Sequence, residues 1–398
     1  MEIKMKPKLF DKTTLQMLII GVVLIAILLL VPTGYEGALI YQESQRAVVE
    51  VVAVDNSMIQ TSGLIQFGEQ TCTLLVKDGT FKGYEIQGVN FLSGSLAEDK
   101  IYQVGDEAFV RISCKPIEDA PDFDGTVING YAVSACVMTD HYRLDKELIL
   151  LGAFFLLLII VAGKNGLQAI FSFVITILAV WKILIPAYLK GYSPVWVGIG
   201  ITVLLTGVII FFVYGFDRRT VVAALGSLLG ILTTCILGII FTDLFQIHGA
   251  VMPDSESLLY SGFEHLDLTA IFMSSIFIGA SGAMMDLSVD ITSAVREVVD
   301  KKPDISWQEA TRSGMNVGRA AMGTMTTTLL LAYSGGYITS LMVYMAQGTP
   351  IDHILNYKYV ASEIMDTVIG SFGLVTVAPF TALVAGWLLT RKPKKTEE

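Results

Sequence analysis

The residues best suited to chemistry lie in the C-terminal third of the chain, where charged and hydroxyl side chains interrupt long apolar stretches. Asp286 and Asp290 are one helical turn apart, and Gly279 and Gly282 fall on the same helical face. A second polar stripe begins at Arg319 and continues through Gly323, Thr324, Thr327 and Thr328. A carboxylate helix opposite an arginine helix favours an ion pair in a low-dielectric bundle. Threonine hydroxyls on the same face would bind a small solute or a dehydrated cation.

The depth of these charges decides between two interpretations. Asp286 ends one charge-free run and Arg319 begins another, while Glu363 and Asp366 precede the last run. Charges at the ends of spans commonly anchor helices among lipid headgroups, whereas charges deeper in a bundle usually mark a solute pathway. Both interpretations are open. An intramembrane protease would need two neighbouring carboxylates, and we expect Asp286 and Asp366 near opposite membrane faces.

Long apolar helices must position these residues. Hydrophobic residues make up 53% of the 398 residues and charged residues only 16%, with a mean hydropathy of +0.62. A helix needs about 20 apolar residues to cross the hydrocarbon core. The sequence therefore predicts an all-α polytopic membrane bundle of about eight spans, on charge-free runs at 13–35, 148–163, 165–181, 191–216, 220–242, 268–285, 320–351 and 367–390.

Small residues on helix faces, several at four-residue spacing, predict close helix packing. The predicted packing glycines are Gly226, Gly230, Gly279, Gly282, Gly318 and Gly323. The run 320–351 is too long for a single crossing, and Ser334, Gly335 and Gly336 interrupt it. Such an interruption is typical of a discontinuous helix at a transport site, and equally of a straight span followed by an interfacial helix.

Lysine and arginine alternate between the loops, which predicts the orientation. The basic positions are the N-terminal tail, Lys164, Arg218 and Arg219, the loop 291–319 and the C-terminal tail. The positive-inside rule then places both termini in the cytoplasm, so the number of crossings is even.

A soluble stretch follows the first span. Residues 36–147 contain 18 acidic and 8 basic residues, a net charge of −10. Alternating β-branched runs and turn pairs such as Asp78-Gly79 predict about five strands. We therefore expect a small extracytoplasmic β-barrel of the OB-like kind. Its three cysteines, Cys72, Cys114 and Cys136, allow one disulfide, whose pairing the sequence leaves open.

Four segments of the chain resemble the YibE/F family of bacterial multi-pass membrane proteins. They are 163–167, 279–298, 314–333 (GMNVGRAAMGTMTTTLLLAY) and 363–379 (EIMDTVIGSFGLVTVAP). The resemblance covers the bundle well and the outer domain loosely, and it implies a permease-like role without a substrate class. The family pattern has an acidic residue after the arginine and an asparagine in the threonine run, where this chain has Ala320 and Thr327. That departure argues against strict ion coupling.

The predicted organisation is a cytoplasmic tail (1–12), an anchor helix (13–35), the extracytoplasmic domain (36–147), a seven-helix bundle (148–390) and a basic cytoplasmic tail (391–398). We expect a secondary transporter or permease in the cell membrane. The alternative is a non-transporting membrane protein whose outer domain binds an envelope partner. We expect no enzymatic activity, cofactor, metal site or nucleic acid, because no such motif is present. The expected partners are lipid, a small solute or ion, an envelope protein at the outer domain and a second copy of the chain.

Overall fold

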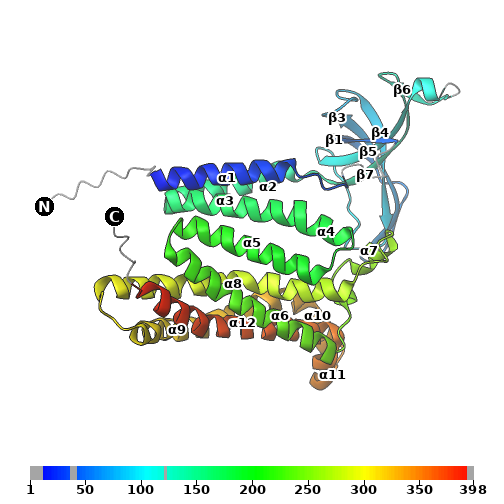
Figure 1. The fold of residues 1–398 in the computed structure, drawn as a ribbon. Coiled ribbons are helices and arrows are strands. Elements are labelled where there is room, and N and C mark those ends of the chain that lie inside the picture. The colour runs from blue at the N-terminus through cyan, green and yellow to red at the C-terminus, as the bar shows by residue number, and fades with distance from the viewer. Residues whose placement is uncertain (1–11, 36–42, 121–122, 392–398) are drawn as a thin grey trace. The chain divides into compact units, whose positions relative to one another are not determined.

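The computed structural model describes residues 12–35, 43–120 and 123–391. Parts of both predicted cytoplasmic tails, 1–11 and 392–398, lie outside these residues. Contacts divide the chain into two units, one of residues 34–157 and the other of the segments on either side (Figure 1). The first unit contains a β-barrel and the second a helical bundle.

The β unit is a closed five-stranded barrel. Its strands pair in the order β1-β5-β7-β4-β3, and β3 pairs with β1 to close the ring. Only the β4–β7 pair is parallel among the described pairings, as in an OB-like barrel, so this prediction is confirmed. The bounds are β1 Ser44–Asp55, β2 Ile59–Ser62, β3 Ile65–Val76, β4 Glu85–Ser93, β5 Glu107–Pro116, β6 Thr126–Ile128 and β7 Tyr131–His141.

Alternation of apolar and polar residues builds the barrel core. In β5, every second residue from Ala108 to Cys114 is buried, and the same period fills the interior from the other strands. Gln70 and Asn90 are also buried, but their side-chain amides bond each other and the backbone carbonyls of Tyr102 and Lys100. Cys72, Cys114 and Cys136 are free and buried, so no disulfide joins them.

The helical unit is a bundle of long apolar helices. The main helices are α1 Lys12–Leu30, α3 Lys164–Ala179, α4 Ile185–Leu189, α5 Pro194–Tyr214, α6 Arg218–Leu244, α8 Leu268–Lys301, α9 Trp307–Ser334, α10 Ile338–Ala346 and α12 Lys358–Leu389. Helix α2 Leu144–Ala162 begins in the first unit and ends in the second. Short helices α7 Ser255–Tyr260 and α11 Ile351–Asn356 lie in connections. A π-helical turn, Val180–Leu184, joins α3 to α4 without a break.

Six helical segments of the described chain are long and apolar enough to cross a membrane, namely 164–189, 194–214, 218–244, 268–301, 307–346 and 358–389. The apolar part of α1, Thr14–Leu30, is shorter, and α2 begins with three charged residues, Asp145, Lys146 and Glu147. The predicted membrane bundle is therefore present, while a total of eight crossings stays a prediction.

Helices α8 and α12 form the centre of the bundle. The largest buried cluster contains Met284 and Ile291 of α8, Leu374 and Ala378 of α12, and Ile231 of α6. Helix α9 packs on α8 and α12 through few residues, since only Ala310, Gly314, Gly318 and Leu329 are buried. Most of α9 is therefore exposed, including its polar face.

The predicted interruption after Ser334 is a single 3₁₀ turn, Gly335–Tyr337, before α10. Gly335 and Ile338 both keep right-handed helical dihedrals, so the segment tightens at this point and continues as a helix. Pro379 lies inside α12, where it removes a helical hydrogen bond.

Candidate functional site

One hydrogen bond provides a reference level near one end of the bundle. The guanidinium of Arg218, at the start of α6, donates to the backbone carbonyl of Arg391, just beyond α12, at 3.0 Å. In addition, the Arg391 guanidinium lies 3.8 Å from the ring centre of Trp387. Distances along the helices from this basic end measure how deep the predicted site residues lie.

The two carboxylates of α8 lie well inside this basic end. Between them, the buried Ser288 hydroxyl donates to the carbonyl of Ala223 at 2.7 Å and accepts from Thr381 at 3.2 Å. Thr381 precedes Arg391 by ten residues, which is about 15 Å of helix. Asp286 and Asp290 flank this level and are exposed on the face of α8 that its neighbours leave open.

Arg319 lies deeper still. The preceding Gly318 packs on Ala378, since a Cβ atom at Gly318 would lie 2.9 Å from the Ala378 Cβ. Ala378 is 13 residues from Arg391 and 12 from Asp366, so Arg319 lies about 20 Å from either end of that stretch. Arg319 is exposed, and it makes no ion pair within the described part of the chain. The predicted pairing with Asp286 is therefore not formed.

The hydroxyl groups of α9 bond within their own helix. Thr324, Thr327 and Thr328 donate to the carbonyls of Ala321, Gly323 and Thr324 at 3.0 to 3.3 Å. All three threonines are exposed. Each hydroxyl keeps acceptor capacity, so the stripe presents oxygen atoms along the open face of α9.

The carboxylates of α12 form a second group together with tyrosines. Tyr333 of α9 lies within electrostatic range of Glu363 and Asp366, and Tyr337 lies within range of Glu363. One carboxylate oxygen of Asp366 is buried without a hydrogen-bond partner. This group lies at the opposite end of α12 from Arg391.

A cavity of about 620 Å³ opens beside this group. Three tyrosines line it, Tyr337, Tyr344 and Tyr359, together with the acidic residues Asp254 and Glu256. Aromatic faces and carboxylates both attract cations. The cavity is therefore suited to admit a positively charged or polar solute.

Tyr333 joins the two groups of site residues. Its hydroxyl lies 2.9 Å from where a Cβ of Gly279 would be, and Gly279 begins the exposed stripe of α8. At the other end of that stripe, the Tyr214 hydroxyl contacts the carbonyl of Val289 and the hydroxyl of Ser293, each at 2.6 Å. Sequence reasoning missed both tyrosines, because contacts between distant helices leave no local pattern.

The predicted packing glycines fall into two groups. A Cβ at Gly226 would meet the Thr381 side chain, and one at Gly230 would meet Val377. Together with Gly318, these residues lie at close helix contacts. Gly282 and Gly323 have open space around them instead, so they widen the exposed polar face.

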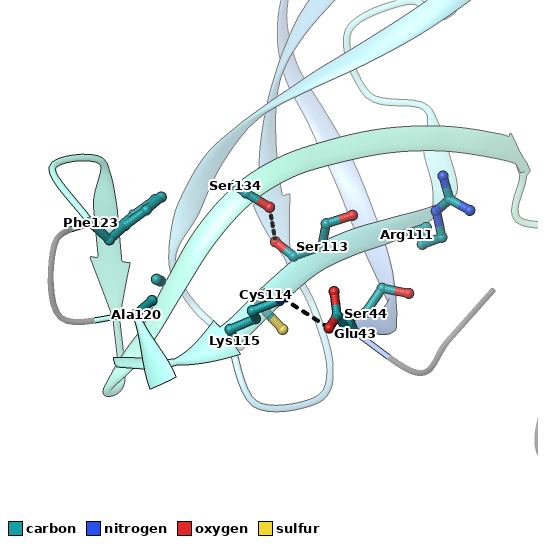
Figure 2. A pocket seen from close by; sticks show the side chains of 10 residues that line it. Glu43, Ser44, Arg111, Ser113, Cys114, Lys115, Ala120, Phe123 and Ser134 are labelled. Carbon is teal, nitrogen blue, oxygen red and sulfur yellow. Dashed lines mark hydrogen bonds and ion pairs between the residues drawn. The ribbon is translucent and has the colours of Figure 1, made fainter. Parts of the chain in front are cut away.

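The barrel carries a separate cavity of about 470 Å³ (Figure 2). Arg111 lies at one side and Phe123 at the other, and Lys115 pairs with Glu43 at 2.9 Å. Burial raises the pKa of the Cys114 thiol, which also lines the cavity. The cavity lies where β1 begins and β5 ends, which is the end of the barrel opposite His141.

Comparison with known families identifies the helical region. A family model described as YibE/F-like protein matches residues 150–391. The chain belongs to this YibE/F-like family. No curated protein and no solved structure matches it. The match includes every predicted site residue and leaves the barrel outside.

In this YibE/F-like protein, the predicted site residues thus lie in two clusters joined by Tyr333. Among the described residues, no group of three or more histidine, cysteine, aspartate or glutamate side chains is placed to hold a metal ion. The arrangement offers carboxylates, hydroxyls and one deep guanidinium. These groups can bind a polar solute or an ion.

Proposed function

We propose that this protein is a secondary transporter or permease for a small polar solute or ion. The path starts at the tyrosine-lined cavity, passes Glu363, Asp366 and Tyr333, and follows the open stripe of α8 to Asp286. The observation that carries the proposal is Arg319, an exposed guanidinium deep in an apolar bundle, within which it has no ion pair. A charge at that depth needs water, a solute or a partner beside it.

Both polar stripes support this path. Gly282 and Gly323 leave space beside the exposed Asp286, Asp290 and Thr327, so oxygen ligands line an open face rather than a packed seam. Pro379 interrupts α12 near the Arg319 level, and a helix at such a point can bend. The proposal gives the chain no enzymatic step.

The proposed orientation has both termini in the cytoplasm of a cell membrane. Basic residues gather at the Arg218–Arg391 end, and the positive-inside rule assigns that end to the cytoplasm. An epitope tag on either terminus should be reachable only after the cells are permeabilised. A tag reached on intact cells would reject this orientation.

Cysteine accessibility tests the solute path without knowledge of the solute. Single cysteines replace Ala283 and Thr327 on the proposed path, and Leu232 on an apolar exposed face of α6 serves as the matched control. A water-soluble, membrane-impermeant thiol reagent should modify the first two residues and spare the third. If Ala283→Cys and Thr327→Cys are sealed against the reagent from both sides in every condition, the path is untenable.

A second candidate function rests on the barrel cavity of Figure 2. In this proposal the outer domain binds an envelope protein through Arg111 and Lys115, at the end of the barrel opposite the start of α2. Replacing residues 36–147 with a short linker would then abolish the cellular activity of the protein. Full activity after the replacement would refute this alternative and leave transport by the bundle in place.

A further inference from the structure

A second surface of the β unit has no assigned role. Strands β2, β3 and β4 extend past the barrel rim, because β1 pairs with β3 only as far as Thr71, while β2 pairs with β3 from Ile65 to Gly68 and β4 pairs with it from Phe67. We call this extension the β2–β3 tip. It exposes six large apolar side chains: Met58, Leu64, Ile65, Phe67, Phe91 and Leu96. Leu64 is 84% exposed and Leu96 is 72% exposed.

Charge is distributed unevenly between the tip and the rest of the domain. The domain carries a net charge of −10, yet residues 56–68 and 91–97 contain no charged side chain. A soluble acidic domain usually surrounds exposed leucine and phenylalanine with charge, so a contiguous apolar patch marks an interaction site.

Strand register places the tip at the barrel end from which the chain enters α2. Strands β4 and β7 run parallel with Val89 opposite Val137, so Ser93 is level with His141. Phe67 pairs with Ser93, and the turn before it therefore projects beyond His141. The tip and the exit of β7 are thus at the same end of the barrel.

The junction between β7 and α2 is short and well anchored. The Tyr142 backbone amide bonds the Glu107 carbonyl at 2.8 Å, its ring lies 5.0 Å from that of Phe109, and Arg143 pairs with Asp140 at 3.1 Å. Helix α2 begins at Leu144 and is free of charge from Leu148 onward. The apolar part of α2, from Leu148 onward, therefore begins up to about 16 Å beyond His141 along the chain.

We infer that the β2–β3 tip inserts its apolar side chains into the surface of the lipid bilayer beside the start of α2. Leu64 lies three residues before Phe67 and projects up to about 10 Å beyond its level, toward the end of the barrel where α2 starts. A cavity of about 230 Å³ lies between Leu64 and Leu96, and because Gln66, Asp99 and Lys100 also line it, it suits the polar glycerol group of a lipid.

Lipid-borne quenchers test the insertion in the full-length protein in nanodiscs. An environment-sensitive fluorophore is placed on Leu64→Cys or Leu96→Cys, and on Val127→Cys as an exposed apolar control at the opposite barrel end. The four native cysteines are buried, and the parent chain measures their background labelling. Spin-labelled acyl chains should quench the first two probes at least twofold more strongly than the control.

Two further measurements show whether the tip contacts lipid or a second copy of the chain. Quenching should persist in purely zwitterionic lipid, because the tip carries no charge, and it should fall at Leu96→Cys when Leu64→Asp is added. Since Leu64 is exposed, this change leaves the fold intact. Equal quenching at the tip and at Val127→Cys overturns the inference. So does excimer formation between two pyrene-labelled Leu64→Cys chains, which would assign the tip to a second copy.

Discussion

The hydroxyl of Tyr333 in α9 lies over Gly279 in α8, 2.9 Å from the position that a Cβ atom there would occupy. This contact links the carboxylates of α12, which interact with Tyr333, to the open stripe that leads toward Asp286. A side chain at position 279 would therefore press on the residue that connects the two halves of the proposed path.

Gly279→Ala and Gly282→Ala form a matched pair that tests this contact. Both substitutions exchange glycine for alanine in one helix, which gains about 1 kcal/mol of helix propensity. Gly282 has open space around it, so its variant should show the full gain in thermal stability. Gly279→Ala should show a smaller gain in thermal stability, because the Tyr333 hydroxyl must move to make room for the new methyl group.

Adding Tyr333→Phe to Gly279→Ala should restore the missing part of the gain, since the hydroxyl is the atom in conflict. Thermal unfolding of the detergent-solubilised full chain measures all three variants. Equal stability of Gly279→Ala and Gly282→Ala would show that Tyr333 does not rest on Gly279.

Close packing between α6 and α12 gives a second prediction. A Cβ at Gly230 would run into the Val377 side chain and would lie 3.1 Å from the Gly373 carbonyl oxygen. Gly230→Ala should therefore lower the free energy of unfolding by about 1 to 3 kcal/mol, as overpacking does in a close-packed core. Gly207→Ala in α5, with open space around it, should be neutral or slightly stabilising. A stable Gly230→Ala chain would contradict the packing.

The sequence predicts the elements of this protein better than their contacts. Charge-free runs locate the long helices because lipid excludes charge over a fixed length, and alternation locates β1 and β5 because one side of each strand fills the barrel. The short strand β2 is not predicted from the sequence, because Ile59–Ser62 is too short to show a clear alternation of apolar and polar residues.

In the candidate site too, positions along one helix follow from the sequence, whereas contacts between helices do not. The spacing of Asp286 and Asp290 on one face follows from helical geometry and was predicted from sequence. The depth of Arg319 is seen only in the structure, from the contact between Gly318 and Ala378. The connection between Glu363 and the α8 stripe is also seen only there, because it runs through Tyr333, 30 residues away in the sequence. A single sequence does not reveal which helix lies beside which.

Thiol chemistry in the barrel gives a third prediction. Burial raises the pKa of Cys72 to about 11 and that of Cys136 to about 12, so at pH 8 no more than about one part in a thousand of either is the reactive thiolate. Iodoacetamide should leave both residues unmodified in the native chain and modify them fully in denaturant, as peptide mass spectrometry can show. Val127→Cys, exposed on the same domain, provides the reactive control. Rapid native modification of Cys136 would contradict its burial.

Asp99 gives the last prediction, because it holds the turn beneath Leu96. Its carboxylate accepts from the amides of Ser93, Gly94 and Ser95 at 2.6 to 2.9 Å and from the Ser93 hydroxyl at 2.9 Å. The backbone hydrogen bond from Ser93 is the main cause that lowers its pKa. A lowered folded-state pKa stabilises the fold fully above the unfolded value of about 3.9, and this stabilisation disappears as the pH falls through the folded value.

Asp99→Asn should therefore reduce protection of the Ser93–Ser95 amides from hydrogen exchange at pH 7. The difference from the unaltered chain, expressed as a protection factor, should shrink as the pH falls below about 4, because the natural carboxylate then also becomes neutral. Glu98→Gln, a neighbouring exposed substitution, controls for the loss of one negative charge and should leave these amides protected. A difference that stays constant between pH 7 and pH 2 would show that the carboxylate charge does not hold the turn.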